Sequence, residues 1–486
     1  MVDLGHWLRL KVSTRRLRLH CEFAAFAWDN ILILIDFHLK RRGRGGCVAG
    51  CAPLVVALTG ALRLAGQNPV PPQKWNLFFQ ATSIGQYHGS FPSPYEGTLS
   101  LLSHPEAEAS LTSTLFFGLR LASNTDFYFD PELAGGRGLS GTNGIANFPN
   151  GEMPRVSAAA PKPYIARLYG THDFGFGPAR EIVIGGVNEL AGSRPMTRYA
   201  VTVGRFSITD FFDNNRYTHD PRTQFMGWAV MYNGAWDYPA DTRGYTWGWV
   251  HEFHTRRWSA RYASAAEPRT ANGPRFDRRV FRDRGDVFEG EADFAPGGHP
   301  GAIRLLSYRN HADAGTYRLA LQRAEATGNT PDVTDTRSPG TLKYGFGVSA
   351  DQQIREDIGV FGRLGWNDGK TESFAFTSID RLATVGVAVT GMRWKRPSDT
   401  AAAALTVTGI SGVHALYLEH GGLDFMIGDG TLRYGAESIF ESYYSVRLVE
   451  GVFVTTDFQR VVNPAFNRDR GPVSIGSLRL HVEWGN

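Results

Sequence analysis

Residues 443–484 read YYSVRLVEGVFVTTDFQRVVNPAFNRDRGPVSIGSLRLHVEW, and this stretch decides the fold. Its final segment alternates strictly between bulky apolar side chains and charged ones. The apolar positions are Leu478, Leu480, Val482 and Trp484, and the positions between them are Arg479, His481 and Glu483. Because successive side chains of a β-strand point to opposite faces, this period of two predicts a strand whose faces meet unlike surroundings. Residues 452–459 alternate in the same way, so the stretch predicts a β-hairpin.

Short alternating segments recur throughout residues 67–486, between polar or glycine-rich connections. They include residues 75–82, 115–121, 245–254, 342–348, 384–393 and 406–419. No apolar run in this part approaches the roughly 20 residues that a membrane-spanning helix needs. If each strand takes roughly 10 residues plus a connection, this part of the chain holds about 16 to 18 strands. The pattern predicts an all-β protein, a transmembrane antiparallel β-barrel of about 16 strands.

The connections differ in length, which also favours a membrane barrel with short periplasmic turns and long extracellular loops. Residues 130–163 and 264–300 are expected to be long loops, and Asn367-Asp368-Gly369 a tight hairpin turn after a strand at 358–366. Aromatic residues cluster at segment ends, as expected for girdles at the two membrane interfaces. The densest cluster contains Trp228, Tyr232, Trp236, Tyr238, Tyr245, Trp247 and Trp249.

Residues 1–66 have the composition of an export leader. They hold 10 Lys or Arg against 4 Asp or Glu, whereas the rest of the chain has a net charge of −2. Basic residues at 40–44 precede an apolar run at 52–66, as in a signal peptide. We therefore expect a leader over residues 1–66, with its hydrophobic region at 52–66, and one barrel domain over residues 67–486. The near-neutral body shows no basic patch, so no nucleic-acid partner is expected.

All three cysteines, Cys21, Cys47 and Cys51, lie in the leader. Their absence from residues 67–486 excludes disulfides, thiolate metal sites and cysteine nucleophiles there. Such a composition suits an exported protein that is stable without cross-links.

Three motifs resemble catalytic or metal-binding sites, but each lacks the context that it needs. Residues 136–141 match G-x-G-x-x-G, yet TNGIANFPNG follows and cannot start the helix of a dinucleotide site. The HEFH sequence at 251–254 is one residue short of the zinc motif and lies in a strand pattern. Residues 210–220 are acidic but lack the spacing of a calcium loop. We expect no catalytic residue, metal or cofactor, although the sequence leaves a spatially assembled triad open.

The cations of residues 67–486 are almost all arginine, with 36 Arg and 5 Lys. Arginine keeps its charge and presents a rigid fork of donors. Facing acidic residues across a water-filled lumen, it would offer fixed hydrogen-bond partners to neutral polyhydroxyl solutes. A general bias toward arginine codons is the alternative explanation. From strand parity, the side chains expected to face the lumen are Glu252, Arg447, Asp457 and Arg479.

Several long motifs, in order, resemble the carbohydrate-selective outer-membrane porins of the OprB type. These motifs are residues 80–101, 130–155 and 203–248, together with the C-terminal stretch quoted above. The resemblance implies a 16-stranded barrel in the bacterial outer membrane, through which sugars diffuse passively into the periplasm. It also implies a constriction lined by arginine and acidic residues. The residues expected to contribute from the central motif, as an inward loop or constriction, are Arg205, Asp210, Asp213, Arg222 and Arg243.

The expected partners are therefore sugars as permeating solutes, outer-membrane lipid, and the barrel-assembly machinery during insertion, with homo-oligomerisation left open. Two other function classes remain at this point. One is an outer-membrane barrel that exports polysaccharide or carries a catalytic cluster at its rim. The other is a soluble exported β-protein that binds glycans, which would be extracted without detergent.

Overall fold

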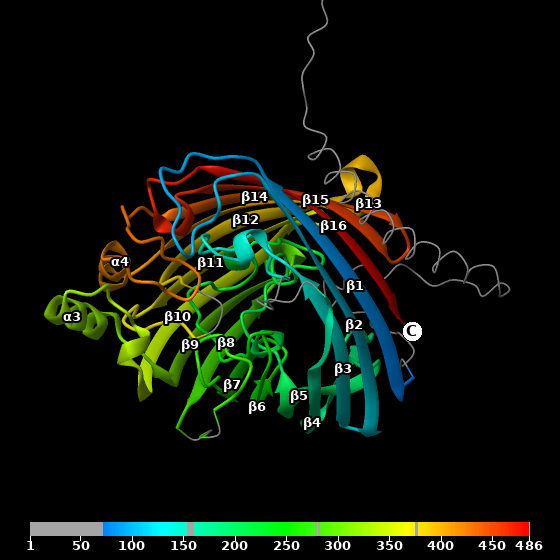
Figure 1. The fold of residues 1–486 in the computed structure, drawn as a ribbon. Coiled ribbons are helices and arrows are strands. Elements are labelled where there is room, and N and C mark those ends of the chain that lie inside the picture. Colours follow the sequence, from blue (N-terminus) through cyan, green and yellow to red (C-terminus); the bar gives the residue numbers. More distant parts are fainter. Residues whose placement is uncertain (1–70, 153–159, 278, 280–281, 375–377, 486) are drawn as a thin grey trace, which may run out of the picture. The chain divides into compact units, whose positions relative to one another are not determined.

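The computed structural model describes residues 71–152, 160–277, 279, 282–374 and 378–485, so the predicted leader lies outside the described residues. Within them the chain forms a closed antiparallel barrel of sixteen strands (Figure 1). The strands are β1 (Trp75–His88), β2 (Glu106–Ala122), β3 (Thr125–Gly136), β4 (Lys162–Val183), β5 (Gly192–Phe206), β6 (Thr246–His254), β7 (Trp258–Ala266), β8 (Arg284–Phe294), β9 (Gly301–Ala314), β10 (Ser338–Arg355), β11 (Ile358–Asn367), β12 (Arg381–Gly391), β13 (Arg396–Gly409), β14 (Glu437–Val449), β15 (Val452–Val462) and β16 (Val473–Gly485).

Helices occur only in the connections of the described chain. The α-helices are α2 (Trp228–Met231), α3 (Tyr317–Thr327) and α4 (Gly412–Glu419). The 3-10 helices are η1 (Leu139–Gly141), η2 (Ile208–Asp210), η3 (Pro296–Gly298), η4 (Thr334–Thr336), η5 (Met392–Trp394) and η6 (Pro464–Phe466). Among the residues that the structure describes, no helix is long and apolar enough to cross a membrane.

The last strand closes the barrel on the first, as the sequence predicts. β1 pairs antiparallel with β16 from Phe78 to His88, and Ser83 lies opposite Leu480. The side chains of Thr82 and His481 are joined by a hydrogen bond of 2.8 Å across this seam. Every strand therefore has two partners, and no edge is left open to lipid.

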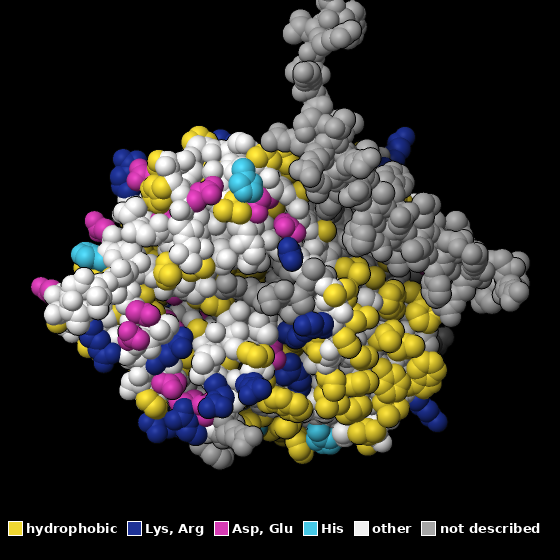
Figure 2. Space-filling model, in the orientation of Figure 1, with side chains coloured by type: hydrophobic (Ala, Val, Ile, Leu, Met, Phe, Trp, Pro, Cys, Tyr) yellow, Lys and Arg dark blue, Asp and Glu magenta, His cyan; other side chains and the backbone are white. Residues whose placement is uncertain are grey.

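The two faces of β16 also follow the predicted parity. Leu478 and Trp484 are 49% and 40% exposed, whereas Arg479 and His481 are buried on the opposite face. Leu480 and Val482 share the parity of the outward residues, with 8% of each accessible. In Figure 2 hydrophobic side chains cover the wall at the lower right, where β1–β4 lie in Figure 1.

Connections alternate in length around the barrel. At one end the strands are joined by residues 123–124, 184–191, 255–257, 295–300, 356–357, 392–395 and 450–451. At the other end the connections are residues 89–105, 137–161, 207–245, 267–283, 315–337, 368–380, 410–436 and 463–472. The predicted arrangement of short turns and long loops is confirmed.

Two of the predicted connections are wrong in detail. Residues 264–300 are not one loop, because β8 lies within them. Asn367 does not start a tight hairpin, since residues 368–380 separate β11 from β12. The buried side chain of Asn367 donates hydrogen bonds to the carbonyl oxygens of Ala235 and Ile379 and accepts one from the backbone N–H of Gly369. It therefore joins two loops instead of turning the chain.

The connection 207–245, here called the inner loop, folds into the barrel (Figure 1). Several of its aromatic side chains belong to the interior core, and Phe212 and Trp236 are almost fully buried. The aromatic cluster expected at the membrane interface is therefore largely internal. Trp228, Tyr238 and Tyr245 are buried within the barrel, whereas Trp247, on β6, is exposed outside. Composition alone could not separate the two cases, because a girdle and a packed loop use the same residues.

Charged residues of the wall hold the inner loop in place. Glu441 on β14 accepts hydrogen bonds from the backbone N–H groups of Met226 (2.6 Å) and Gly227 (3.0 Å). Arg363 on β11 donates to the carbonyl oxygen of Val230 at 2.8 Å. Such bonds satisfy backbone groups that would otherwise be buried without partners.

A buried histidine joins three of the long connections. Nδ1 of His414, on α4, lies 3.0 Å from Asp380 Oδ2, and its Nε2 lies 3.0 Å from Asp424 Oδ2. The ring stacks on Tyr317, from α3, with centroids 4.3 Å apart. Burial by itself would lower the pKa of His414, but the two carboxylates outweigh burial and raise the pKa to about 9.

We expect the melting temperature of the folded barrel to fall between pH 7 and pH 10. Because the folded-state pKa of His414 is about 9, above its ordinary value, the stabilisation is complete below that ordinary value and is lost as the pH rises through about 9. The shift corresponds to roughly 3 kcal/mol of unfolding free energy. His414→Gln should lower the melting temperature at pH 7 and reduce its further fall between pH 7 and pH 10. His420→Gln, on an exposed histidine, should do neither. If the melting temperature of His414→Gln fell as steeply between pH 7 and pH 10 as that of the unaltered protein, His414 would not be the group responsible.

The seam between β1 and β16 can be tested by cross-linking, because residues 71–486 contain no cysteine. With Cys21, Cys47 and Cys51 replaced by Ser, the pair Ser83→Cys and Leu480→Cys should form an intramolecular disulfide on oxidation. Directly opposite residues have the Cβ separation that a disulfide needs. The measurement is the shift in electrophoretic mobility of the unreduced, heat-denatured chain. Ser83→Cys with Leu478→Cys, two residues out of register, is the control, and equal cross-linking of both pairs would contradict the register.

Candidate functional site

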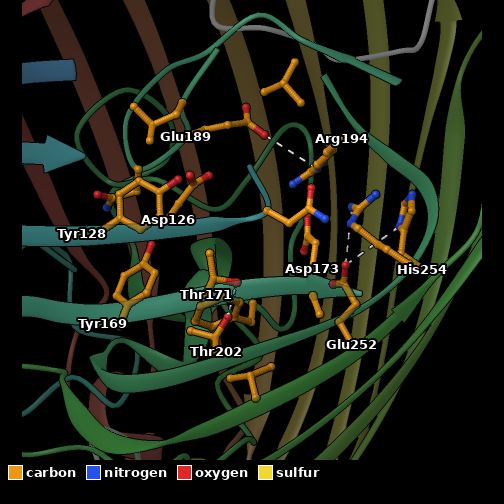
Figure 3. A pocket seen from close by; sticks show the side chains of 18 of the residues that line it. Asp126, Tyr128, Tyr169, Thr171, Asp173, Glu189, Arg194, Thr202, Glu252 and His254 are labelled. Carbon is orange, nitrogen blue, oxygen red and sulfur yellow. Dashed lines mark hydrogen bonds and ion pairs between the residues drawn. The ribbon is translucent and has the colours of Figure 1, made fainter. Parts of the chain in front are cut away.

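A cavity of about 350 Å³ lies inside the barrel, against the inner faces of β2 to β7 (Figure 3). Its lining is polar and charged, with two tyrosines, Tyr128 and Tyr169, whose ring centroids are 5.1 Å apart. Asp210 and Phe211 of the inner loop, and Glu189 of the short connection 184–191, complete it. The cavity is thus bounded by wall, inner loop and a folded-in turn.

Strand alternation brings the lining residues onto one face. Tyr169, Thr171 and Asp173 lie two residues apart on β4, and Arg198, Ala200 and Thr202 do so on β5. Thr171 and Thr202 meet across the two strands, with their hydroxyl oxygens 3.0 Å apart. Figure 3 shows Tyr169, Thr171, Asp173 and Thr202 around the same space. The residues between them, such as the 56% exposed Val203, point outward.

Arginines and carboxylates alternate across neighbouring strands, partly within this lining, and we call this row the charge belt. Its members, in order from β4–β5 to β10, are Arg194, Glu181, Arg198, Glu252, Arg261, Glu291, Arg304 and Asp351. Successive N–O distances include 2.8 Å for Arg194–Glu181, 2.7 Å for Arg198–Glu181 and 2.6 Å for Arg261–Glu291. Each of the strands β4 to β10 supplies at least one member, so the belt runs around this part of the inner wall.

A second charged group lies toward the inner loop. Arg167 on β4 forms a two-pronged ion pair with Asp210 (2.7 and 2.6 Å). Arg222 of the inner loop pairs with Glu132 at 2.9 Å and with Glu152 at 2.8 Å. Burial raises the pKa of Glu152, an effect that the positive charge of Arg222 opposes. Paired arginines of this kind are held rigidly. Nη1 of Arg222 is also used, because it donates to Gln80 and Thr114.

The structure divides the nine residues named from the sequence into three groups. Asp210 and Glu252 line the cavity. Asp213, Arg222 and Arg479 bind the inner loop: Asp213 pairs with Arg363 at 2.8 Å, and Arg479 donates to the carbonyl oxygens of Pro221 and Gln224 at 2.7 Å each. The others lie elsewhere in or beside the barrel.

Those remaining four are dispersed. Arg205 pairs with Asp241 at 2.6 Å, and the guanidinium of Arg243 lies 3.8 Å from the ring centroid of Tyr164. Asp457 is buried on the inner face of β15, and its carboxylate accepts a hydrogen bond from Gln459. Arg447 lies near the end of β14, beside the connection 450–451, and donates to Ser398 Oγ. It is not part of the charge belt.

Most of the charge belt was missed from the sequence. Arg194, Arg198 and Arg261 are all lining residues that were not named. The alternation of β5 does predict that Arg198 faces inward, because Arg198, Ala200 and Thr202 alternate with Tyr199, Val201 and Val203. Arg194 has no such signal, since Pro195 and Met196 interrupt the alternation. Within the described part of the chain, no group of His, Cys, Asp and Glu side chains could hold a metal ion.

Comparisons with known proteins agree with this architecture. The family model of the carbohydrate-selective porins, OprB family, matches residues 110–484. A search of curated protein sequences finds no match. The high-pH structure of Pseudomonas putida OprB is similar with a TM-score of 0.64 and 15% identity, over 85% of this chain and 94% of that chain. At this identity the likeness shows a shared fold.

Two further solved structures match less closely. The low-pH structure of Pseudomonas putida OprB has a TM-score of 0.44 and 12% identity, over 84% of this chain and 92% of that chain. The Salmonella typhi OmpF complex with daunomycin has a TM-score of 0.46 and 6% identity, over 85% of this chain and 98% of that chain.

Removing one carboxylate from the charge belt should change its ion preference. Glu252→Gln leaves Arg198 and Arg261 less compensated, so we expect the cation-to-anion permeability ratio to fall by roughly twofold. The measurement is the reversal potential of the protein in planar bilayers under a salt gradient. Glu356→Gln, on an exposed residue of the connection 356–357, is the control. Two results would contradict a role of the belt in ion selectivity. One is an equal shift of the reversal potential in both variants, and the other is a higher cation-to-anion permeability ratio in Glu252→Gln.

Proposed function

The chain belongs to the OprB family of carbohydrate-selective porins, and we propose that the cavity inside β2 to β7 is where permeating sugars contact the barrel. Family membership makes the protein an outer-membrane channel for sugars, and a passive one rather than an enzyme. Family membership therefore argues against the alternatives left open by the sequence, which were a polysaccharide exporter, a barrel enzyme and a soluble glycan-binding protein. What remains to be proposed is how this chain selects its solutes.

The observation that carries the proposal is the pairing of opposite charges around the cavity. Arg194 lies 3.7 Å from Glu189, and Arg198 lies 3.8 Å from Glu252, which also pairs with Arg261. Asp173 lines the same cavity. A neutral sugar can replace its lost water by hydrogen bonds to both signs of group without adding a charge to the site. A free ion gains little, because the groups of opposite sign are already paired with each other.

Aromatic surface contributes the apolar part of the site. The C–H faces of a pyranose ring are apolar, and Tyr128 and Tyr169 supply aromatic rings beside the charged groups. Hydrogen bonds from rigid groups, together with contacts to the tyrosine rings, would allow the cavity to recognise a sugar. Conduction also requires that each contact be weak enough for the solute to leave. Fixed, already paired groups meet this need, since they do not close around the solute.

The nine residues named from the sequence take different proposed roles. Asp210 and Glu252 are proposed to contact the solute directly. Asp213, Arg222 and Arg479 are proposed to position the inner loop that bounds the passage, and Arg205 and Arg243 to line its approach from the side of the long connections. Asp457 and Arg447 are proposed to line other parts of the interior, away from the cavity.

Three further features remain proposals. Residues 1–66 are proposed to be a leader that carries a signal peptide, and residues 67–486 a single barrel domain. Insertion is proposed to use the barrel-assembly machinery, since a closed sheet presents no edge once it is formed. Self-association into a homo-oligomer is left as a proposal that cross-linking in intact membranes would address.

Filling the cavity should slow sugar entry. Thr202→Trp places an indole where Thr202 faces Thr171, whereas Val203→Trp places the same group on the lipid side. In liposome-swelling assays we expect the unaltered protein to admit monosaccharides faster than trisaccharides. Thr202→Trp should reduce the rate several-fold, most of all for the larger sugars, and Val203→Trp should leave it within about a factor of two.

The two variants differ by one position in the chain but lie on opposite faces, so they control for expression and insertion. Heat-modified mobility in electrophoresis shows that each barrel is folded. Swelling no faster than in protein-free liposomes would refute the channel itself. Equal rates for Thr202→Trp and the unaltered protein would refute only the assignment of the sugar path to this cavity.

A further inference from the structure

A charged group lies on the outer wall of the barrel, where apolar residues are the rule. On β8 the outward positions are Arg284, Asp286 and Phe288, and on β9 they include Leu305 and Arg309. Strand register places Asp286 directly opposite Arg309, and Arg309 directly opposite Tyr344 of β10. One level nearer the short connections, the outward row consists of Tyr262, Phe288, Ser307 and Phe346.

One buried carboxylate organises the group. Asp286 is 5% exposed and accepts hydrogen bonds from Arg284 Nε (3.2 Å), Arg309 Nε (3.2 Å) and the hydroxyl of Tyr262 (2.9 Å). Two guanidinium groups thus share one carboxylate, and the group carries a net positive charge. Asp286 fixes both arginines on the wall, so little side-chain freedom would be lost on binding an anion.

Arg309 keeps its terminal nitrogens available. Its side chain is 59% exposed, and only Nε is used, in the bond to Asp286. Within the described residues, Nη1 and Nη2 of Arg309 have no hydrogen-bond partner. A planar fork of two free N–H groups is the geometry that binds phosphate oxygens in pairs.

The height of the group on the wall matches the edge of the membrane. β9 begins at Gly301, on the side of the short periplasmic turns, and reaches Arg309 after crossing the exposed Ile303 and Leu305. At about 3.3 Å per residue and a tilt of about 40°, this path rises roughly 20 Å. The apolar band of such barrels is about 25 Å tall, so Arg309 lies near its outer limit, where lipid headgroups begin.

We propose that Arg309 and Arg284, held by Asp286, bind a phosphate group of an outer-leaflet lipid. The acyl chains of that lipid lie along Leu305, Phe288 and Phe346, the exposed apolar residues nearer the membrane centre. The phosphate accepts hydrogen bonds from Nη1 and Nη2 of Arg309 and offsets the charge that Asp286 leaves uncompensated. The site faces lipid and is separate from the sugar path, which lies inside the barrel.

A matched pair of arginines makes the proposal testable. Arg393 resembles Arg309 in exposure (53%) and is likewise paired with one aspartate, Asp357, but it lies at the opposite end of the barrel. The test uses the whole folded barrel in detergent and measures binding of lipid A by native mass spectrometry. Lipid A with its phosphates, lipid A stripped of them, and inorganic phosphate are the three probes.

We expect phosphorylated lipid A to bind the unaltered protein roughly tenfold or more tightly than the stripped form, since hydrogen bonds between a guanidinium and a phosphate are charge-assisted and strong. Arg284→Gln combined with Arg309→Gln should remove this preference, and Arg393→Gln should retain it. Sugar swelling rates should be the same in all three proteins, which also shows that the double variant is folded.

Other outcomes would overturn the proposal. Equal binding of phosphorylated and stripped lipid A would show that acyl chains alone are recognised. Equal loss in Arg393→Gln would show a general effect of cationic charge. Displacement of the lipid by millimolar inorganic phosphate would assign the site to a free anion instead. None of these results depends on whether the inner cavity is the sugar path.

Discussion

The pairing of β1 with β16 is the constraint on which the rest of the structure depends. In the hydrocarbon of a membrane no water can satisfy backbone N–H and C=O groups, so a sheet there must have no edge. The register of this seam, with Ser83 opposite Leu480, fixes which side chains of both strands face inward. A shift of one residue would exchange Arg479 with its apolar neighbours and place a guanidinium in lipid, at a cost of about 2–4 kcal/mol near the midplane.

Closing the sheet creates an interior that the wall alone does not fill, and the inner loop takes up part of it. Its aromatic residues pack together, while its backbone is hydrogen-bonded to polar side chains of the wall such as Glu441 and Arg363. The buried charges therefore have partners, as burial requires. The proposed passage for solute is the space that the loop leaves open beside β2 to β7. The same arrangement explains why charged residues of the inner face are divided between holding the loop and lining the cavity.

Arginine has different consequences on the two faces of one wall. Inside, Arg198 and Arg261 belong to a belt in which nearly every charge is paired, which suits neutral solutes. Outside, Arg309 and Arg284 share one carboxylate at the membrane edge and leave a net positive charge. The residue type is the same in both places. In the two proposed roles, the number of carboxylates within reach determines whether the group favours a neutral sugar or an anionic lipid headgroup.

The sequence by itself determined the barrel, its alternating faces, its closure and its family, because the period of two and the motif order are local properties of the chain. Of the site, it found Asp210 and Glu252 but not Arg194, where Pro195 and Met196 hide the alternation. It also placed Trp228 and Tyr238 at a membrane interface, although they are buried in the inner loop. Only the tertiary structure decided the path of that loop, the charge belt and the shared carboxylate of Asp286, since each joins residues far apart in the chain, and local patterns carry no record of such contacts.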